Sequence, residues 1–484
     1  MDVDIPDQIS ALISQLPQGT GKRTHRTVPV DASHPFELET YIANYTGRGA
    51  IDRLIHIITS APSIAPEAFN VVVQHIQQTR DPSLYQHALN AYEEVAAHAQ
   101  LPPPSDLATL DTRWADEMIA SNQIERQKLE TEVKTYMNNL IKESIRMGLR
   151  DLGDFYRSIG EHGGALKQYT RSREFCTTSQ HVLDMCLSVL ELLIEHRNYS
   201  HIATYVFKAD AAIDAASSAA QASGATGAPT SSKKGSAERD KVQSKLDFAT
   251  GLSSLGQAHY EKAAMCFLRL GPPHQLGDWL GKLVAPGDIA IYGALCSLAS
   301  LSRSAIKAQV IDNPTFASYI EHEPYIRELI EAYMSSNFKV ALDLLSKFST
   351  RHFLDINLAP HLHDLTNLIR DRAVVLYFQP FSSIKLERMG ASFGWSLGEV
   401  ERHVVRLIQS GDIKGRVDSQ NKVLQAKQTD HRTELFARAS KAGKDIQNSN
   451  RKLLLRMRLQ QADLVVKAPK GSHAQPTTER HTPE

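Results

Sequence analysis

One helix–turn–helix signature constrains the fold of this 484-residue chain more than any other feature. Gly153 is followed by Tyr156, Gly160, Ala165 and Tyr169, which is the spacing of a tetratricopeptide repeat. Gly153 and Ala165 allow two antiparallel helices to approach closely, while Tyr156 and Tyr169 fill the space between them. We expect Gly160 to end the first helix in the left-handed conformation that glycine adopts easily.

The same pattern recurs twice, in weaker form. Tyr260-Glu-Lys-Ala263 with Phe267 repeats the start of a second helix, and Gly251 stands where Gly153 stood. A third copy, Asn337-Phe-Lys-Val-Ala341 with Leu345, is more degenerate. Such units bury their faces only against neighbouring units, so the copies predict a stacked helical-repeat arm over residues 35–361.

Three segments lack the apolar residues that a repeat needs. Residues 1–34 and 468–484 are polar, and we expect disordered tails there. Residues 215–237 contain no apolar residue larger than Ala apart from Pro229, which predicts a flexible surface insertion. Between the first helices and the repeats, apolar residues at steps of mostly three or four predict one long helix from about Asp106 to Met147.

A different pattern follows the arm, over residues 362–428. Ser383 is placed to cap a short helix, and Ser396-Leu-Gly-Glu399 is a capping box that opens a second helix. Two short strands follow, which we expect at Ile413–Val417 and Lys422–Ala426. Helix, turn, helix and two-stranded wing make a winged helix. The fold class is therefore mainly α: a tetratricopeptide-like solenoid, a winged-helix domain and a long C-terminal helix.

Two surfaces of this C-terminal half are candidates for binding other proteins. A wing edge can continue a neighbour's sheet, and the residues assigned to it are Ile413, Arg416, Val417 and Val423. Residues 429–467 form the last element, whose helix is predicted from about Thr433 to Lys467 and would be roughly 50 Å long. Its apolar stripe needs partner helices, and the residues assigned to that bundle interface are Leu435, Ile446, Leu453, Met457 and Leu464.

Charge and composition disfavour several other classes. The chain has 54 basic and 54 acidic side chains, so no overall charge attracts nucleic acid. The second helix of the winged domain mixes Glu399 and Glu401 with Arg402 and Arg406, and is not a basic face for a DNA groove. A nucleic-acid-binding regulator therefore stays a minor alternative. No secretory signal or membrane span is evident, and the four cysteines are scattered, so we expect buried free thiols in a reducing compartment.

Two sequence strings resemble enzyme motifs without the required context. Gly390-Ala-Ser392-Phe-Gly394 fits the serine hydrolase string, but a predicted helix precedes it instead of a strand. His361 and His363 lie two residues apart, and Val374 occupies the position where a metalloprotease of this kind has its Asp. We therefore predict no catalytic residue, no metal site and no cofactor.

Several segments resemble the COP9 signalosome subunit 1 family. They are Glu37–Tyr41, Tyr45–Arg48, Ile51–Leu54, Ile141–Ile145, Asp151–Asp154 and Ala165–Cys176, and the block Leu386–Leu424 is similar to that family's PCI domain. The resemblance covers roughly residues 36–466. It implies a non-catalytic scaffold in a complex that removes Nedd8 from cullins and so regulates cullin-RING ubiquitin ligases.

The resemblance also implies partners and a location. The partners would be other PCI-domain and MPN-domain subunits and cullin-RING ligase clients, with the zinc isopeptidase centre on another subunit and the chain in nucleus and cytoplasm. The paralogous subunit of the 26S proteasome lid has the same architecture. Motif-level physics leaves that alternative open.

Overall fold

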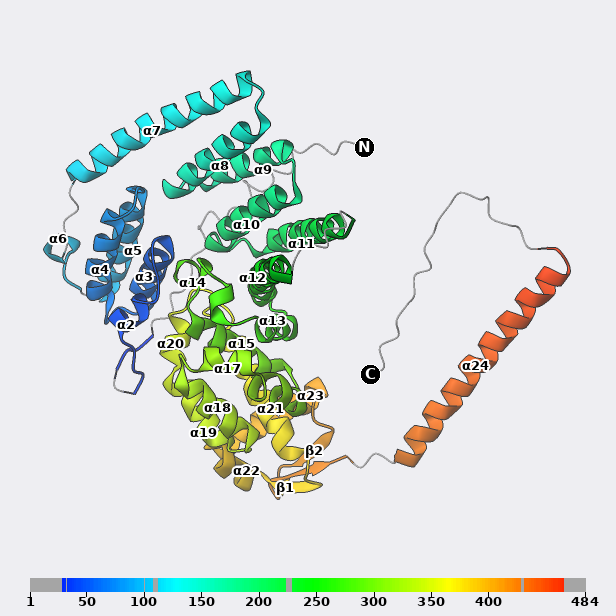
Figure 1. Ribbon diagram of the computed structural model, residues 1–484. Helices are drawn as coiled ribbons and strands as arrows, with labels where there is room; N and C mark the ends of the chain where they lie inside the picture. The colour runs from blue at the N-terminus through cyan, green and yellow to red at the C-terminus, as the bar shows by residue number, and fades with distance from the viewer. Residues whose placement is uncertain are drawn as a thin grey trace.

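The computed structural model describes residues 28–31, 33–99, 101–107, 112–222, 229–427 and 431–464. Figure 1 shows helices stacked along a curved arm, with the first helices beside its middle and the last helix standing away from the body. A small sheet lies at the end of the arm opposite α7 (Thr112–Asn138). The predicted fold class, a helical solenoid followed by a winged helix, is confirmed.

The helices of the first half occupy residues 38–268. They are α2 (Leu38–Ile42), α3 (Arg48–Ser60), α4 (Ala65–Gln77), α5 (Ser83–Ala99), α6 (Pro104–Leu107), α7, α8 (Lys142–Ser158), α9 (His162–Ser172), η1 (Arg173–Phe175), α10 (Ser179–Glu195), α11 (Tyr199–Ala222), α12 (Pro229–Gly256) and α13 (Tyr260–Leu268).

The second half completes the arm and adds the sheet. Its elements are η2 (Pro273–Gln275), α14 (Trp279–Lys282), α15 (Pro286–Ser300), α16 (Arg303–Ile306), η3 (Lys307–Ile311), α17 (Pro314–Ile320), α18 (Pro324–Met334), α19 (Phe338–Lys347), α20 (Ser349–Phe353), α21 (Leu362–Phe378), β1 (Ser383–Lys385), α22 (Leu386–Phe393), α23 (Leu397–Ser410), β2 (Gly415–Asp418), β3 (Val423–Ala426) and α24 (His431–Gln461).

Four helical hairpins of the arm share one turn geometry. They are α8–α9, α10–α11, α12–α13 and α18–α19, and their turns place Gly160, Arg197, Ala258 and Ser336 at positive φ. In each turn the next N–H donates to a carbonyl five residues back: Glu161 to Tyr156, Asn198 to Leu193, His259 to Ser254, and Asn337 to Ala332, at 2.8–2.9 Å. This is the six-to-one hydrogen bond of a Schellman cap, so the same local backbone motif turns the chain in each hairpin.

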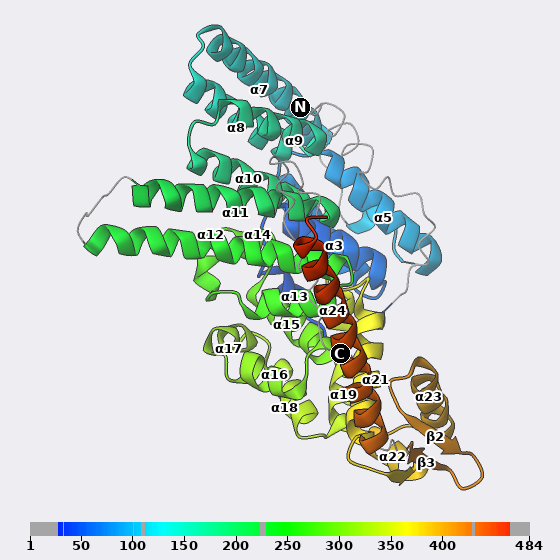
Figure 2. The ribbon, with the colours of Figure 1, turned by 90° about the vertical axis from the view of Figure 1, so that its right-hand side faces the viewer.

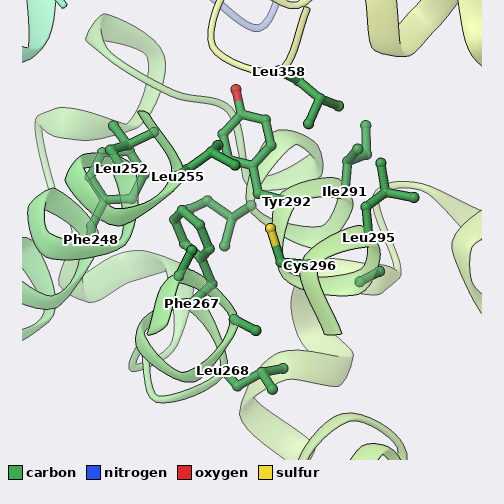
Figure 3. Close-up of a cluster of buried hydrophobic side chains, with 14 of the residues drawn as sticks. Phe248, Leu252, Leu255, Phe267, Leu268, Ile291, Tyr292, Leu295, Cys296 and Leu358 are labelled. Carbon is green, nitrogen blue, oxygen red and sulfur yellow. The ribbon is translucent and has the colours of Figure 1, made fainter. Parts of the chain in front are cut away.

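Close packing inside these hairpins depends on glycine. A Cβ added at Gly153 would lie 2.6 Å from the Tyr169 ring, and one at Gly251 would lie 2.9 Å from the Phe267 ring. The two glycines therefore play the same part in different hairpins. Figure 3 shows the core around the second, where Phe248, Phe267 and Tyr292 from α12, α13 and α15 converge.

The structure corrects the long helix predicted from Asp106 to Met147. The segment divides into α6, α7 and the start of α8, with residues 108–111 outside the described part of the chain. Leu140 has a φ of 55°, which no α-helix accommodates, and it separates α7 from α8. Apolar residues recur at helical spacing on both sides of this break, because α7 and α8 each turn an apolar face to the core. The spacing therefore did not reveal that one helix ends and another begins.

The predicted insertion is also more helical than expected. Helix α11 continues to Ala222 and α12 starts at Pro229, so only 223–228 lie outside the described residues. Ala has the highest helix propensity, and an Ala-rich run extends a helix without needing a core. Figure 2 shows α11 and α12 side by side as a long pair that projects from the arm.

The N-terminal tail predicted for residues 1–34 ends earlier than expected. The Val28 N–H donates to the Ser60 carbonyl at 2.9 Å, and Thr350 donates to the Pro29 carbonyl at 3.0 Å. Residues 1–27 and the tail predicted at 468–484 lie outside the described residues.

The buried apolar residues form two clusters. The larger extends from Val133 to Leu424 and is continuous through the arm into the winged domain. The smaller comprises helices α2–α5 together with Ala285 and Leu354 from the middle of the arm. The first helices thus pack against residues between 193 positions (Tyr92 to Ala285) and 316 positions (Leu38 to Leu354) later in the sequence.

Candidate assembly surfaces

The winged domain ends in a three-stranded antiparallel sheet of order β1-β3-β2. The third strand was not predicted: Ser383, expected as a helix cap, instead begins β1 and pairs with Gln425, and α22 starts only at Leu386. Helix α23 opens with the predicted capping box, in which the Ser396 N–H donates to Glu399 at 3.0 Å. Strand β2 pairs on one side with β3 and is an edge strand of the sheet.

The four residues assigned to a wing surface do not lie together on it. Arg416 is exposed on the edge strand and reaches Gln425 across the sheet at 3.2 Å. Val417 and Val423 are half-buried. Ile413 is only 3% exposed, so it belongs to the core of the domain, and its assignment to the surface was wrong. Ile413 precedes β2, its N–H donates to the Leu407 carbonyl of α23, and its side chain belongs to the large buried cluster.

The charged face of α23 is largely paired within the domain. Lys422 lies 3.0 Å from Glu401, and Arg406 donates to Asp371 of α21. His403 lies 3.2 Å from the same Asp371 carboxylate, and burial lowers the pKa of His403, which favours its neutral form. These pairings neutralise Arg406 and Lys422, two of the cations that could contact a phosphate backbone.

Helix α24 is the second candidate surface. Its side chains from Arg432 onward are exposed, including all five residues assigned to a bundle interface: Leu435 63%, Ile446 62%, Leu453 54%, Met457 62% and Leu464 69%. The helix is shorter than predicted, because Asp463 adopts a φ of 57° and the Leu464 N–H closes back on Leu459. An apolar stripe this exposed is a marker of an interaction surface.

A buried ionic network joins the first helices to the arm. Asp288 of α15 is completely buried, and its carboxylate lies 3.6 Å from Arg53 of α3 and 2.8 Å from Arg351 of α20. The Tyr45 hydroxyl donates to the same carboxylate, and Arg351 also lies 3.3 Å from Glu323. Burial alone would raise the pKa of Asp288, but the two guanidinium groups outweigh it and lower that pKa.

The sequence analysis missed this network. Its members are separated by as many as 306 positions (Tyr45 to Arg351), so no local spacing reveals it. One signal was available in the sequence, because Asp288 interrupts the apolar run that opens α15. Its carboxylate caps the start of the helix two residues after Pro286. A carboxylate buried there needs a cation nearby. The network joins Arg53 of α3 and Tyr45 before it to α15 and α20.

The enzyme-like strings lie in ordinary structural settings. Ser392 belongs to helix α22, where its hydroxyl contacts Tyr377 at 2.8 Å and Arg388 at 3.1 Å. His361 lies 3.5 Å from the Tyr260 hydroxyl, whereas His363 contacts Asn367 at 3.0 Å, so the two rings have different neighbours. Within the described residues no three metal-ligating side chains gather.

The cysteines and helices bear on two further expectations. Cys186, Cys266 and Cys296 are buried and free, whereas Cys176 is half-buried. Burial raises the pKa of Cys296 to about 12 and that of Cys186 to about 11, which makes both thiols unreactive at neutral pH. None of the helices described is both long enough and apolar enough to cross a membrane.

Comparison with known proteins gives the family. COP9 signalosome complex subunit 1 of Arabidopsis thaliana is 32% identical over 456 residues, which cover 94% of this chain and 96% of the relative. The subunit 1 of Emericella nidulans is 33% identical over 446 residues, covering 90% and 82%. The chain belongs to the COP9 signalosome subunit 1 family. The resemblance stated from the sequence is confirmed.

Members of this family are non-catalytic in type and, as signalosome subunits, are parts of a multi-subunit complex. Two family models match the chain: 26S proteasome subunit RPN7 over residues 111–309 and the PCI domain over residues 345–428. A 26S proteasome non-ATPase regulatory subunit 6 of Dictyostelium discoideum is 21% identical over 366 residues, covering 75% of this chain and 89% of the relative. The proteasome proteins are therefore more distant paralogues.

Proposed function

We propose that this chain is a structural subunit of a COP9 signalosome that removes Nedd8 from cullins and so regulates cullin-RING ubiquitin ligases. The observation that carries the proposal is the similarity to subunit 1 proteins along nearly the whole chain. In this proposal the isopeptidase centre with its zinc ion lies on another subunit. The chain holds that subunit's neighbours in place and works in both nucleus and cytoplasm.

The two candidate surfaces have separate roles in this proposal. The edge strand β2 meets the winged domain of a neighbouring PCI subunit, because its outer backbone groups can extend a neighbour's sheet. Helix α24 enters a bundle with helices of PCI and MPN subunits. The repeats of the arm face other subunits or a cullin-RING ligase client.

A second candidate is a proteasome lid subunit of the same architecture. The match of the RPN7 model to residues 111–309 favours it, but identity to the proteasome relatives is lower. A nucleic-acid-binding role has less support, because Arg406 of α23 pairs with Asp371, and Lys422 before β3 pairs with Glu401.

Co-purification tests the proposal. The tagged chain is isolated under gentle conditions from its native cells, and every co-purifying protein is identified by mass spectrometry. We expect several PCI proteins, a zinc isopeptidase subunit and cullins. Proteasome ATPases and lid subunits in their place would assign the chain to the paralogous complex and refute the signalosome function. Cell fractionation of the same tagged chain tests its distribution between nucleus and cytoplasm.

A further inference from the structure

The two halves of α24 can be compared side by side. Five helical turns contain about 18 residues, so residues 18 positions apart lie on the same side of a straight helix. Leu435 thus shares its side with Leu453, and Ile446 shares its side with Met457, because three turns contain about 11 residues. Both halves therefore carry the apolar stripe.

The opposite side differs between the halves. In the first half it holds Ala437 and Lys441, whereas the same angular positions in the second half hold Leu455 and Leu459. Leu455 is 60% exposed and Leu459 is 39% exposed. Leu454 lies between the two sides, as Phe436 does in the first half, and Arg456 and Arg458 lie at the angles between the apolar side chains. The second half therefore has apolar side chains on two opposite sides of the helix, and a single partner surface cannot cover both.

A polar run divides the two halves. Gln447–Lys452 contains no apolar side chain over six consecutive residues. Beyond it, Leu453–Leu464 provides six of the 20 exposed large apolar side chains found among the described residues. Exposed apolar side chains are thus densest in one short segment at the C-terminal end of the helix, and such a surface marks an interaction site.

The charges of the second half specify that partner's chemistry. Between Gln447 and Gln461 the helix carries Arg451, Lys452, Arg456 and Arg458 but no acidic residue. A cation that becomes buried needs an opposite charge nearby, and the nearest acidic residues of the chain, Asp445 and Asp463, lie outside this stretch of the helix. The surrounding surface must therefore contribute carboxylates.

We infer that α24 binds in two different ways along its length. The first half, His431–Ile446, lies on a partner surface by one face only. The segment Leu453–Leu459 is enclosed between partner helices that cover two opposite sides of it, and acidic side chains of those helices face its Arg residues. This inference rests on the proposed function, because it takes the partners to be helices of the same complex.

Three full-length single variants test the enclosure, each co-expressed with the partner subunits. Leu455→Lys changes the side opposite the stripe in the second half, and Ala437→Lys is its matched control in the first half. Leu453→Lys changes the stripe itself. Lys has nearly the helix propensity of Leu, so none of these substitutions breaks the helix. The readout is the amount of each variant that co-purifies with the complex.

We expect Leu455→Lys and Leu453→Lys to lower recovery in the complex at least tenfold, while Ala437→Lys stays within twofold of the wild type. If only Leu453→Lys loses the complex, α24 docks by one face throughout, and the enclosure is refuted while the proposed bundle stands. If both Leu455→Lys and Ala437→Lys lose it, the division into two halves is refuted. Full recovery of Leu453→Lys would refute the proposed entry of α24 into a bundle.

The acidic surroundings have their own test. Arg456→Glu with Arg458→Glu should reduce recovery at least tenfold, whereas Lys441→Glu with Lys444→Glu, the control on the polar face of the first half, should not. Normal recovery of Arg456→Glu with Arg458→Glu would overturn the acidic partner. Loss of binding to a short DNA duplex by that variant, with the complex intact, would instead assign the basic segment to nucleic acid.

Discussion

Single glycines decide how closely the helices of the arm can pack. A Cβ at Gly153 would meet the Tyr169 ring at 2.6 Å, and that ring is only 1% exposed. Its hydroxyl donates to Asp154 at 2.5 Å, which holds the ring in place. The contact can be relieved only by moving α8 away from α9.

We therefore predict that Gly153→Ala lowers the free energy of unfolding by about 1–3 kcal/mol, the usual effect of overpacking. Gly398→Ala is the control, because nothing lies within 4 Å of an added Cβ there and alanine favours the helix. Thermal unfolding of both variants measures the difference. An equal midpoint for the two would show that α8 and α9 adjust without strain.

Residue-scale signals also explain what the sequence could and could not predict. Gly160 and Gly251 revealed their hairpins because glycine is typical of a left-handed cap or a close helix contact. The α10–α11 hairpin was missed because its left-handed residue is Arg197. Arginine, unlike glycine, does not indicate this conformation in a sequence. The local hydrogen bond from the Asn198 N–H to the Leu193 carbonyl closes this turn as in the other hairpins. In the sequence, only the aromatic Tyr199, two positions after Arg197, resembles Tyr260 after Ala258.

At the scale of elements, the exposed stripe of α24 was predictable and its partners were not. We predict that Leu453→Asp with Met457→Asp releases the chain from its complex, because carboxylates on the stripe cannot be buried without a cation. Ala437→Asp with Asn448→Asp adds the same charge to the opposite side of the first half and the polar run, and should remain bound. Size-exclusion chromatography of the complex checks both. An unchanged elution of the first variant would contradict the prediction.

The α11–α12 projection is the element that assembly should need least. Arg239 lies 3.9 Å from Asp214, so the two helices run side by side at the start of the predicted insertion. We predict that replacing 215–237 by a short Gly/Ser linker leaves assembly intact, as measured by recovery of the complex. An insertion of equal length made only of Gly and Ser is the control. Loss of assembly in both would show that the helical extension itself contacts a partner.

At the scale of the whole molecule, the shape depends on contacts that no sequence window contains. The winged domain follows the arm directly and shares its core, so its position could be expected from chain order. The first helices instead fold back onto α15 and α20 through Asp288, Arg53 and Arg351. Removing one partner of a buried ion pair leaves an uncompensated charge, which is why this network controls where α2–α5 sit.

Asp288→Asn should therefore detach the first helices from the arm. We predict a loss of about 3–5 kcal/mol, as for other broken buried pairs, with faster amide hydrogen exchange in α3. Asp278→Asn is the matched control, because that carboxylate contacts Lys245 at 2.6 Å but is 52% exposed, and its loss should change stability by less than about 1 kcal/mol. Equal rates of amide hydrogen exchange in α3 of the two variants would show that apolar packing alone holds α2–α5 against the arm.

The pH dependence of the same variant gives an independent check. The folded pKa of Asp288 is lowered from 3.8, so the folded protein binds the proton more weakly than the unfolded chain does. The carboxylate's contribution is thus complete at neutral pH and is lost as the pH falls from about 3.8 through the lowered pKa. Urea unfolding at several pH values should show that the difference in unfolding free energy between wild type and Asp288→Asn decreases only in that acidic range. A difference that decreases near neutral pH would mean that another group, and not the Asp288 carboxylate, stabilises the contact between the first helices and the arm.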